Sequence, residues 1–405
     1  MATIEQYIID TDGVSGDYDG VDDFFSNYSG SKNLVSADKV IRLVCQASTG
    51  VADTTIGISL VDPTWNTDDT RRIEIVAAEG HRAGHKWDTS KYILSGTMSG
   101  GEIIDCEGGI KILVKGLQIY GGPSSGTGKK IFDPDGSSNA IWVEDCFIRM
   151  HLTGSGWGYG ILYTSSDYGH VKNCIWYGNG GSIGAAPCIA TGSGAVTIVN
   201  NLLIGWRFGI DSGGANTKAI NNIARDQDTG DYGYRGTFHA DSDYNSDEVS
   251  GYAVVKSPRS NTSSPWYSGA TSNADIWTDF AGYDFSLKSD STIFSGVGIG
   301  PSSNSDVPDD DIDGDVRTGT TTDLGPDTWG AVATLDQEGF RWRNDDGSES
   351  AATWRQIQDT NDSIGVEANI RLRMLLNGTE DPASKQFKIQ CKKKTDPASE
   401  WRDLS

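Results

Sequence analysis

The stretch Thr197–Gly214, TIVNNLLIGWRFGIDSGG, decides the fold because it places two adjacent asparagines inside an otherwise apolar run. The pattern returns in AINNIARD (219–226), where Asn221 and Asn222 take the places of Asn200 and Asn201. Asparagine adopts the left-handed backbone region more readily than other residues that carry a side chain. The paired amides therefore predict a sharp turn between two buried strands.

The same step recurs along the chain. It is present in VKGLQI (114–119), VEDCFI (143–148), VKNCIW (171–176), VNNLLI (199–204) and INNIAR (220–225). The apolar residue after each polar pair stands at position 117, 147, 175, 202 or 223, which gives spacings of 30, 28, 27 and 21 residues. A second series of isoleucines, at positions 103, 131, 161, 189 and 210, runs out of phase with the first. Two interleaved series with one period indicate at least two short strands per repeat, which is typical of a β-solenoid.

Residues at the same turn of successive coils are expected to stack about 4.8 Å apart. Stacked amides can then hydrogen-bond to their neighbours above and below. One predicted column contains Asp145, Asn173, Asn200 and Asn221, and the next contains Gly116, Cys146, Cys174, Asn201 and Asn222. The five asparagines are thus predicted to form a structural ladder. Free thiols are expected at Cys146 and Cys174, with a disulfide between them as the alternative.

The alternation of N-x-I and N-N-x-x turns with G-I-x-x-x strands resembles the right-handed parallel β-helix of pectate-lyase-like proteins, over about residues 35–300. This resemblance implies an all-β solenoid over residues 41–325, preceded by a capping segment at 1–40. YDFSLKSDSTIFSGVGIG (283–300) and DDDIDGDVRTGTTTDLGPD (309–327) are similar to the closing segment of bacterial and phage β-helix domains.

Residues 336–405 have a different pattern. The segments FRWRN, IRLRMLL and FKIQCKKK alternate like strands, and turn-forming segments such as NGTEDPAS separate them. The expected domain is a small immunoglobulin- or fibronectin-like β-sandwich. The string EGFRWRNDDGSE (338–349) resembles a C-terminal module of phage virion proteins.

Composition limits the classes of partner. The chain has 33 Lys and Arg against 56 Asp and Glu, a formal net charge of -23, which repels phosphate backbones and anionic lipid. We therefore expect neither nucleic acid nor membrane as a partner. The first residues, MATIEQYIIDTDG, show no secretory signal pattern, and the six cysteines are too scattered for a disulfide framework.

Many β-helix proteins cleave polysaccharides, so catalysis has to be considered. Pectate lyases carry a W-I-D-H strand motif, whereas this chain has WVEDC at 142–146, with cysteine in the histidine position. An ordinary strand is expected there. Hydrolysis instead needs two carboxylates placed on either side of a glycosidic bond. Asp105 and Asp133 fall in one column of consecutive coils and are the candidate pair. The alternative is that Lys129 or Lys130 neutralises them, or that they face solvent.

Exposed aromatic side chains can stack on sugar rings, and Trp176, Tyr177 and Trp206 are the candidates for contact with a glycan or a protein partner. Core packing is the alternative for these residues.

No cofactor or metal is predicted. The DxDxDG string at 309–314 matches the start of a calcium loop, but its twelfth position is Thr320 instead of glutamate. His81 and His85 lie in a Gly-rich loop without the spacing of a zinc helix.

These observations favour a non-enzymatic structural or adhesive protein of a bacteriophage virion, assembled in the host cytoplasm. Its location would be the capsid surface, a fibre or the tail. The expected partners are other virion proteins, further copies of the chain in a homo-oligomer, with a trimer favoured, and host surface polysaccharide. A tailspike-type polysaccharide hydrolase or lyase and a bacterial surface adhesin are the alternatives.

Overall fold

The computed structural model describes most of the chain. The described residues are 2–11, 16–48, 50–54, 58–60, 64–96, 101–134, 138–164, 167–178, 187–225, 232–247, 276–288, 298–317, 319–327, 335–344, 353–355, 357–358, 370–378, 390–391 and 402–403. Internal contacts divide the chain into two compact units, residues 1–330 and residues 331–405.

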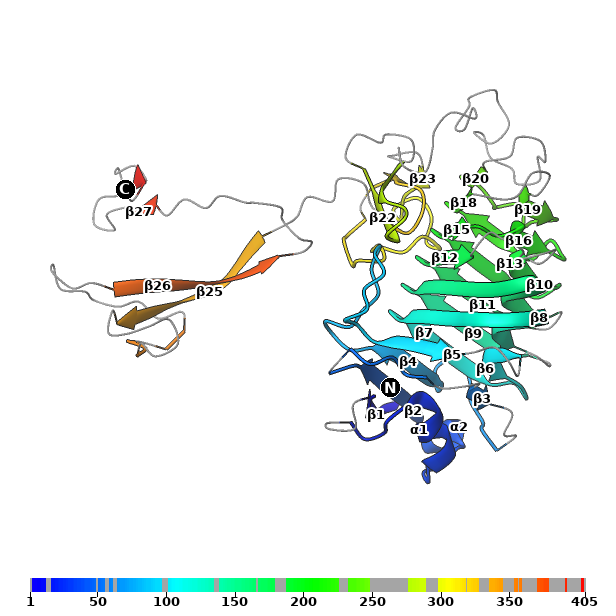
Figure 1. Ribbon diagram of the computed structural model, residues 1–405, viewed down its shortest axis with the longest axis horizontal. Coiled ribbons are helices and arrows are strands. Elements are labelled where there is room, and N and C mark those ends of the chain that lie inside the picture. The colour runs from blue at the N-terminus through cyan, green and yellow to red at the C-terminus, as the bar shows by residue number, and fades with distance from the viewer. Residues whose placement is uncertain are drawn as a thin grey trace. The chain divides into compact units, whose positions relative to one another are not determined.

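Parallel strands of the first unit form two stacked sheets (Figure 1). In spatial order, the first sheet contains β1 (Thr3–Asp10), β2 (Lys39–Gln46), β4 (Ile73–Ala77), β7 (Lys111–Lys115), β9 (Ala140–Glu144), β11 (Tyr168–Lys172), β14 (Val196–Val199) and β17 (Lys218–Ile220). Strands of successive coils are in register, so that Val143 pairs with Val171 and Val171 with Ile198. These side chains are buried and form a continuous apolar column.

The second sheet receives two strands from most coils. Its strands are β3 (Ile58–Leu60), β5 (Ile93–Gly96), β6 (Glu102–Cys106), β8 (Gln118–Pro134), β10 (Phe147–Tyr163), β12 (Ile175–Gly178), β13 (Pro187–Thr191), β15 (Leu202–Ile204), β16 (Phe208–Ser212), β18 (Ile223–Arg225), β19 (Tyr232–Gly236) and β20 (Ser246–Asp247). The chain thus returns to the first sheet once per coil. The expected all-β fold with long parallel sheets is confirmed, and this strand order is consistent with a β-helix.

The register of the first repeats differs from the sequence prediction by one residue. Lys115 pairs with Glu144 and Gln118 with Phe147, so Gly116 shares a column with Asp145, not with Cys146. The reason is conformational. Gly116 has a φ of 71° and occupies the left-handed corner position, whereas the sequence interpretation took it as the second residue of the polar pair. In the second series, Ile104 and Phe132, not the isoleucines before them, align with Ile161.

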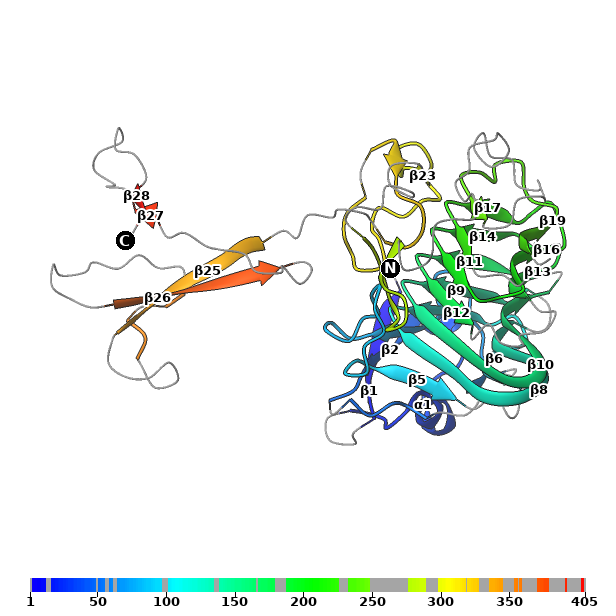
Figure 2. The same cartoon turned by 45° about the horizontal axis from the view of Figure 1, so that its top comes forward.

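The expected capping segment also contributes β1, which pairs in parallel with β2. Two short helices follow β1, α1 (Val21–Asn27) and α2 (Leu34–Ala37). Phe24 of α1 packs against Tyr7, Tyr18 and Tyr28, and Tyr28 stacks on Trp65 at 5.6 Å between ring centroids. This aromatic cluster joins the hydrophobic interior. Figure 2 shows α1 at the end of the solenoid that holds β1.

The closing segment folds back along the outside of the second sheet. It contains β21 (Trp277–Asp279), β22 (Asp284–Leu287), β23 (Gly298–Ile299) and β24 (Thr321–Thr322). Its apolar side chains cover outward-facing residues of β10, β12, β15 and β18 and form a second hydrophobic cluster. The members of that cluster include Phe147, Ile175, Leu202, Ile223, Trp277, Phe285, Ile312 and Leu324. The outer surface of these strands is therefore a packed interface within the first unit.

In the second unit, β25 (Leu335–Asn344) pairs antiparallel with β26 (Ile370–Gly378), and β27 (Gln390–Cys391) with β28 (Arg402–Asp403). The guanidinium of Arg341 lies over the Trp354 ring, 4.2 Å from its centroid. Most of the segment 345–405 lies outside the described residues, so the β-sandwich stays a prediction. Among the described residues, no helix is long and apolar enough to cross a membrane.

Candidate functional site

The outer column of the predicted ladder lies at the corner between the two sheets. Asp145, Asn173, Asn200 and Asn221 all have φ angles between 52° and 56°. The Asn173 amide donates to Asp145 Oδ1 at 3.1 Å, Asn200 to Asn173 at 3.2 Å, and Asn221 to Asn200 at 3.1 Å. All four side chains are buried, so these bonds replace hydrogen bonds to water.

An inner column points into the coil. The Asn201 amide donates to the carbonyls of Val171 and Val199 at 2.9 and 3.0 Å and to Asn222 Oδ1 at 2.9 Å. Asn222 donates in the same way to Asn245 Oδ1 at 2.8 Å. The sequence comparison missed Asn245 because its corner is Tyr244-Asn245, and Tyr244 takes the left-handed position at a φ of 57°.

Cys146 and Cys174 occupy the inner column in the two preceding coils, and both are free thiols. Cys174 Sγ donates to the Lys172 carbonyl at 3.0 Å, and Cys146 Sγ to the Glu144 carbonyl at 3.1 Å. Burial raises the pKa of the Cys174 thiol well above its ordinary value, and the neighbouring Cys146 thiol adds to that shift. Both thiols are therefore placed as inert core groups.

The candidate catalytic carboxylates stand side by side, because Asp105 of β6 pairs with Asp133 of β8. Asp133 is buried, and Lys130 forms an ion pair with it. Glu102 Oε1 lies 3.9 Å from the same Lys130 ammonium. A buried carboxylate held by a lysine is a stabilised anion, which does not suit a general acid.

Two of the three predicted contact residues are buried. Trp176 is 0 % exposed and Trp206 1 % exposed, and both belong to the interior cluster. The prediction that Trp176 faces outward is wrong, because Ile175 and Tyr177 take the outward positions of β12. In the structure, neither indole is accessible to a sugar.

Tyr177 lies on the outer side of β12 in a partly buried group that sequence reasoning missed. The guanidinium of Arg149 lies over Tyr283 at 3.8 Å from the ring centroid, over Trp87 at 4.8 Å and over Tyr120 at 5.5 Å. Tyr177 packs edge-on against Tyr283 at 5.1 Å. We name these five residues the aromatic–arginine surface. No ion pair joins Arg149 to a residue in the described ranges, and its Nε has no hydrogen-bond partner there. Arg149 lies on β10, and four other segments of the chain each supply one of the aromatic residues.

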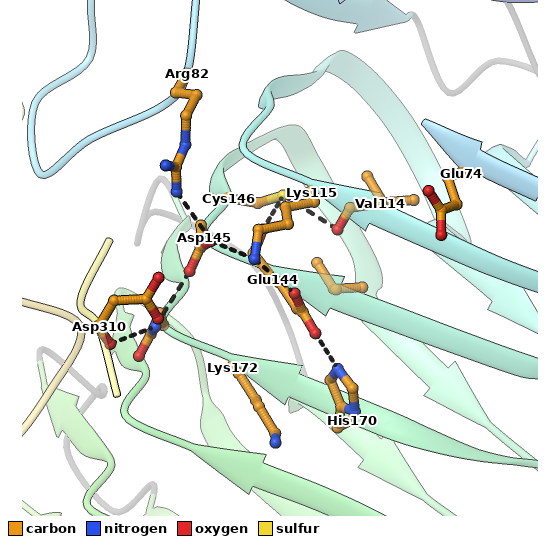
Figure 3. Close-up of polar contacts among 12 residues, drawn as sticks. Glu74, Arg82, Val114, Lys115, Glu144, Asp145, Cys146, His170, Lys172 and Asp310 are labelled. Atoms are coloured by element: carbon orange, nitrogen blue, oxygen red, sulfur yellow. Dashed lines mark hydrogen bonds and ion pairs between the residues drawn. The ribbon is translucent and has the colours of Figure 1, made fainter. Parts of the chain in front are cut away.

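A second polar group lies on the first sheet (Figure 3). Lys115 Nζ lies between Glu144 Oε2 at 2.9 Å and Asp145 Oδ2 at 3.1 Å, and Glu144 Oε1 lies 2.7 Å from His170 Nε2. Arg82 also contacts Asp145, at 3.1 Å. Glu144 and Asp145 come from the WVEDC string, in which Glu144 ends β9 and Asp145 takes the left-handed corner after it.

The charges of this polar group perturb its pKa values. Burial alone would raise the pKa of Glu144, but the hydrogen bonds and charges of His170 and Lys115 lower it to about 2. Burial lowers the pKa of His170, against the hydrogen bond and charge of Glu144, and Nε2–H of His170 donates to Glu144. Burial raises the pKa of Asp145, against the attraction of Lys115. The arrangement is a chain of compensating charges across parallel strands.

The DxDxDG string does not fold as a calcium loop. Asp311 is buried, and its Oδ1 accepts hydrogen bonds from the backbone N–H groups of Asp313 and Asp315 at 3.0 and 2.8 Å. Its carboxylate thus stabilises its own turn. Asp313 instead points to His85, whose Nδ1 lies 2.6 Å from Asp313 Oδ2.

The sequence matches no known protein family, and searches of curated proteins and of solved structures found no similar protein.

Proposed function

We propose that this chain is a non-enzymatic structural and adhesive component of a bacteriophage particle, which contacts host surface glycans through the aromatic–arginine surface. The finer features expected from the sequence belong to this proposal: a right-handed coil, a C-terminal β-sandwich that docks on another virion protein, and a trimeric assembly. The sequence resemblance supports them.

The observation that carries the non-enzymatic part is that Asp133 of the candidate pair, and Glu144 of the WVEDC string, each pair with a lysine. Asp133 is held by Lys130, and Glu144 by Lys115 and His170. Acid–base hydrolysis of a glycosidic bond needs one protonated carboxyl group and one free carboxylate near neutral pH. The ion pairs oppose protonation of both groups. They instead stabilise a surface of stacked strands.

The adhesive part rests on the aromatic–arginine surface. Tyrosine and tryptophan rings offer apolar faces that stack on sugar rings, and a guanidinium binds a carboxylate through paired hydrogen bonds. Arg149 stands out on an acidic chain because it lies partly buried among aromatic rings and has no carboxylate partner in the described ranges. Acidic bacterial polysaccharides are therefore the preferred ligand class.

Glycan binding can be tested with the purified full-length chain on an array of bacterial envelope polysaccharides, followed by calorimetry on the best ligand. Arg149→Ala should weaken binding at least tenfold, because it removes the only positive charge of this surface. The matched control is Arg207→Ala, since Arg207 also lies over an aromatic ring, Phe208, at 5.2 Å. Equal binding by Arg149→Ala and wild type would exclude this surface as the glycan site.

Particle association needs its own experiment. Phage particles purified from lysed cells that carry the gene should contain the chain at a fixed copy number, measured by quantitative mass spectrometry. Recovery of the chain on the surface of intact, uninfected bacteria would favour the bacterial adhesin instead.

A further inference from the structure

His85 connects an early loop of the solenoid to the closing segment. Its Nδ1 contacts Asp313 Oδ2 at 2.6 Å across 228 positions of sequence, and its Nε2 lies 3.8 Å from Asp284 Oδ1. The backbone follows the same path, because Phe285 N–H donates to the His85 carbonyl at 2.9 Å. Asp327, from the end of the closing segment, completes the group.

The geometry of this group is that of potential metal ligands. One nitrogen of His85 and one carboxylate oxygen each from Asp313 and Asp327 lie within 4.8 Å of one another. Tetrahedral ligands at about 2.1 Å from a metal are about 3.4 Å apart, so an ion would replace the 2.6 Å contact between His85 and Asp313, with small movements of the side chains.

The burial of Asp327 is an independent indication. Asp327 is only 7 % exposed, and its Oδ2 accepts a hydrogen bond from the Leu287 N–H at 3.2 Å. The buried Asp327 carboxylate lies beside the His85 imidazole and the Asp313 carboxylate. Three carboxylates, those of Asp284, Asp313 and Asp327, surround one imidazole. The nearest lysine ammonium, Lys86 Nζ, lies 3.7 Å from Asp284 and is largely exposed. The buried guanidinium of Arg317 also attracts Asp327, and a bound cation would neutralise the remaining buried negative charge.

We propose that His85, Asp313 and Asp327 bind one divalent transition-metal ion, which fastens the closing segment to the solenoid. An imidazole nitrogen with two carboxylate oxygens suits Zn²⁺ or Mn²⁺ better than Ca²⁺, which takes oxygen ligands only. The fourth position of a tetrahedral ion is open to water or to Asp284. The site is different from a calcium loop formed by the string 309–314, because Asp313 is the only residue of that string among the three proposed ligands. The ion is a structural cross-link between segments that are far apart in sequence, and it does not depend on the proposed glycan contact.

The test uses the full chain after treatment with EDTA and dialysis. Titration with ZnCl₂ and with MnCl₂ should each show about one site per chain by calorimetry, and CoCl₂ should give visible absorption bands of a cobalt ion with nitrogen and oxygen ligands. A hundredfold excess of Zn²⁺ over its dissociation constant should raise Tm by at least about 4 °C.

His85→Gln and Asp327→Asn should each lower the affinity at least tenfold and remove the Tm increase. Asp313→Asn, at an exposed position, provides a third variant if a buried change prevents folding. The matched control is the exposed pair His239 and Asp241, whose side chains lie 3.5 Å apart; His239→Gln should leave binding unchanged. Absence of saturable binding, or equal binding by the three variants, would overturn the proposal and leave a hydrogen-bonded imidazolium–carboxylate group.

Discussion

The side-chain amide of Asn200 donates a hydrogen bond to Asn173 Oδ1 at 3.2 Å, although the two residues are 27 positions apart. Both have left-handed backbone conformations, with φ angles of 56° and 52°. One residue type therefore satisfies two requirements of the corner, the turn and the contact between coils. Each coil fixes the position of the next through this bond.

Removal of an inner-column amide should destabilise the fold strongly. Asn201→Ala removes the acceptor of the Cys174 N–H and the side-chain donor to the Val171 and Val199 carbonyls, of which the Val199 carbonyl keeps the Asn173 N–H at 3.1 Å. Buried polar groups that lose a partner cost about 1–3 kcal/mol each, so a total loss of about 2–4 kcal/mol is expected. Urea unfolding monitored by circular dichroism measures it. Asn216→Ala, which removes one exposed bond to the Ser193 carbonyl, is the control and should cost under about 1 kcal/mol.

The left-handed conformation at Asn200 makes its replacements unequal. Asn200→Gly and Asn200→Val both lose the amide bonds, but only valine carries a β-branched side chain into the left-handed region. We expect Asn200→Val to be less stable than Asn200→Gly by about 2 kcal/mol. The difference in urea midpoint between the two variants measures this backbone term. Equal midpoints would show that the corner relaxes to a negative φ.

Acid sensitivity should depend on Glu144. Its pKa in the folded state, about 2, lies below its ordinary value of 4.5, so its contribution to stability is present above pH 4.5 and is lost as pH falls towards 2. A shift of this size corresponds to roughly 3 kcal/mol. Glu144→Gln should lower Tm at pH 7 and flatten the loss of Tm between pH 4.5 and 2. Glu107→Gln, at an exposed position, should follow the wild-type profile. The same profile in Glu144→Gln and wild type would contradict the ion-pair network of Figure 3.

Lys130 should stabilise the folded state through its ion pair with Asp133. Lys130→Met leaves a buried carboxylate without its cation, and loss of one partner from a buried pair costs about 3 kcal/mol. The double variant Lys130→Met/Asp133→Leu should regain most of the lost stability, because both charges are then absent. Lys172→Met, on β11 of the first sheet, serves as the control. A double variant that is no more stable than Lys130→Met would show that the ion pair is not the source of the loss.

The repeat pattern predicted the coil arrangement because it recurs at the same corner. The register of Gly116 could not be predicted, since glycine takes the same left-handed conformation as asparagine without being polar. The direction of Trp176 could not be predicted either. Both faces of β12 are apolar, because the closing segment covers the outer face, and alternation then no longer separates inside from outside.

Sites that combine distant segments were beyond sequence reasoning for a different reason. Arg149 meets Trp87 and Tyr283, and His85 meets Asp313, only because the closing segment folds back over early coils. The spacing of residues within one short stretch of sequence does not predict contacts between distant segments. The Asp105–Asp133 pairing, by contrast, follows from equal spacing in consecutive coils and is present in the structure.

The most direct test of the central claim is the chain length of a bound polysaccharide before and after incubation with the purified protein. Size-exclusion chromatography with light scattering measures the chain length, and a reducing-end assay runs on the same samples. The account predicts binding with unchanged chain length and no new reducing ends. Shortening of the polysaccharide that Asp133→Asn abolishes would contradict it and establish a glycan-cleaving enzyme.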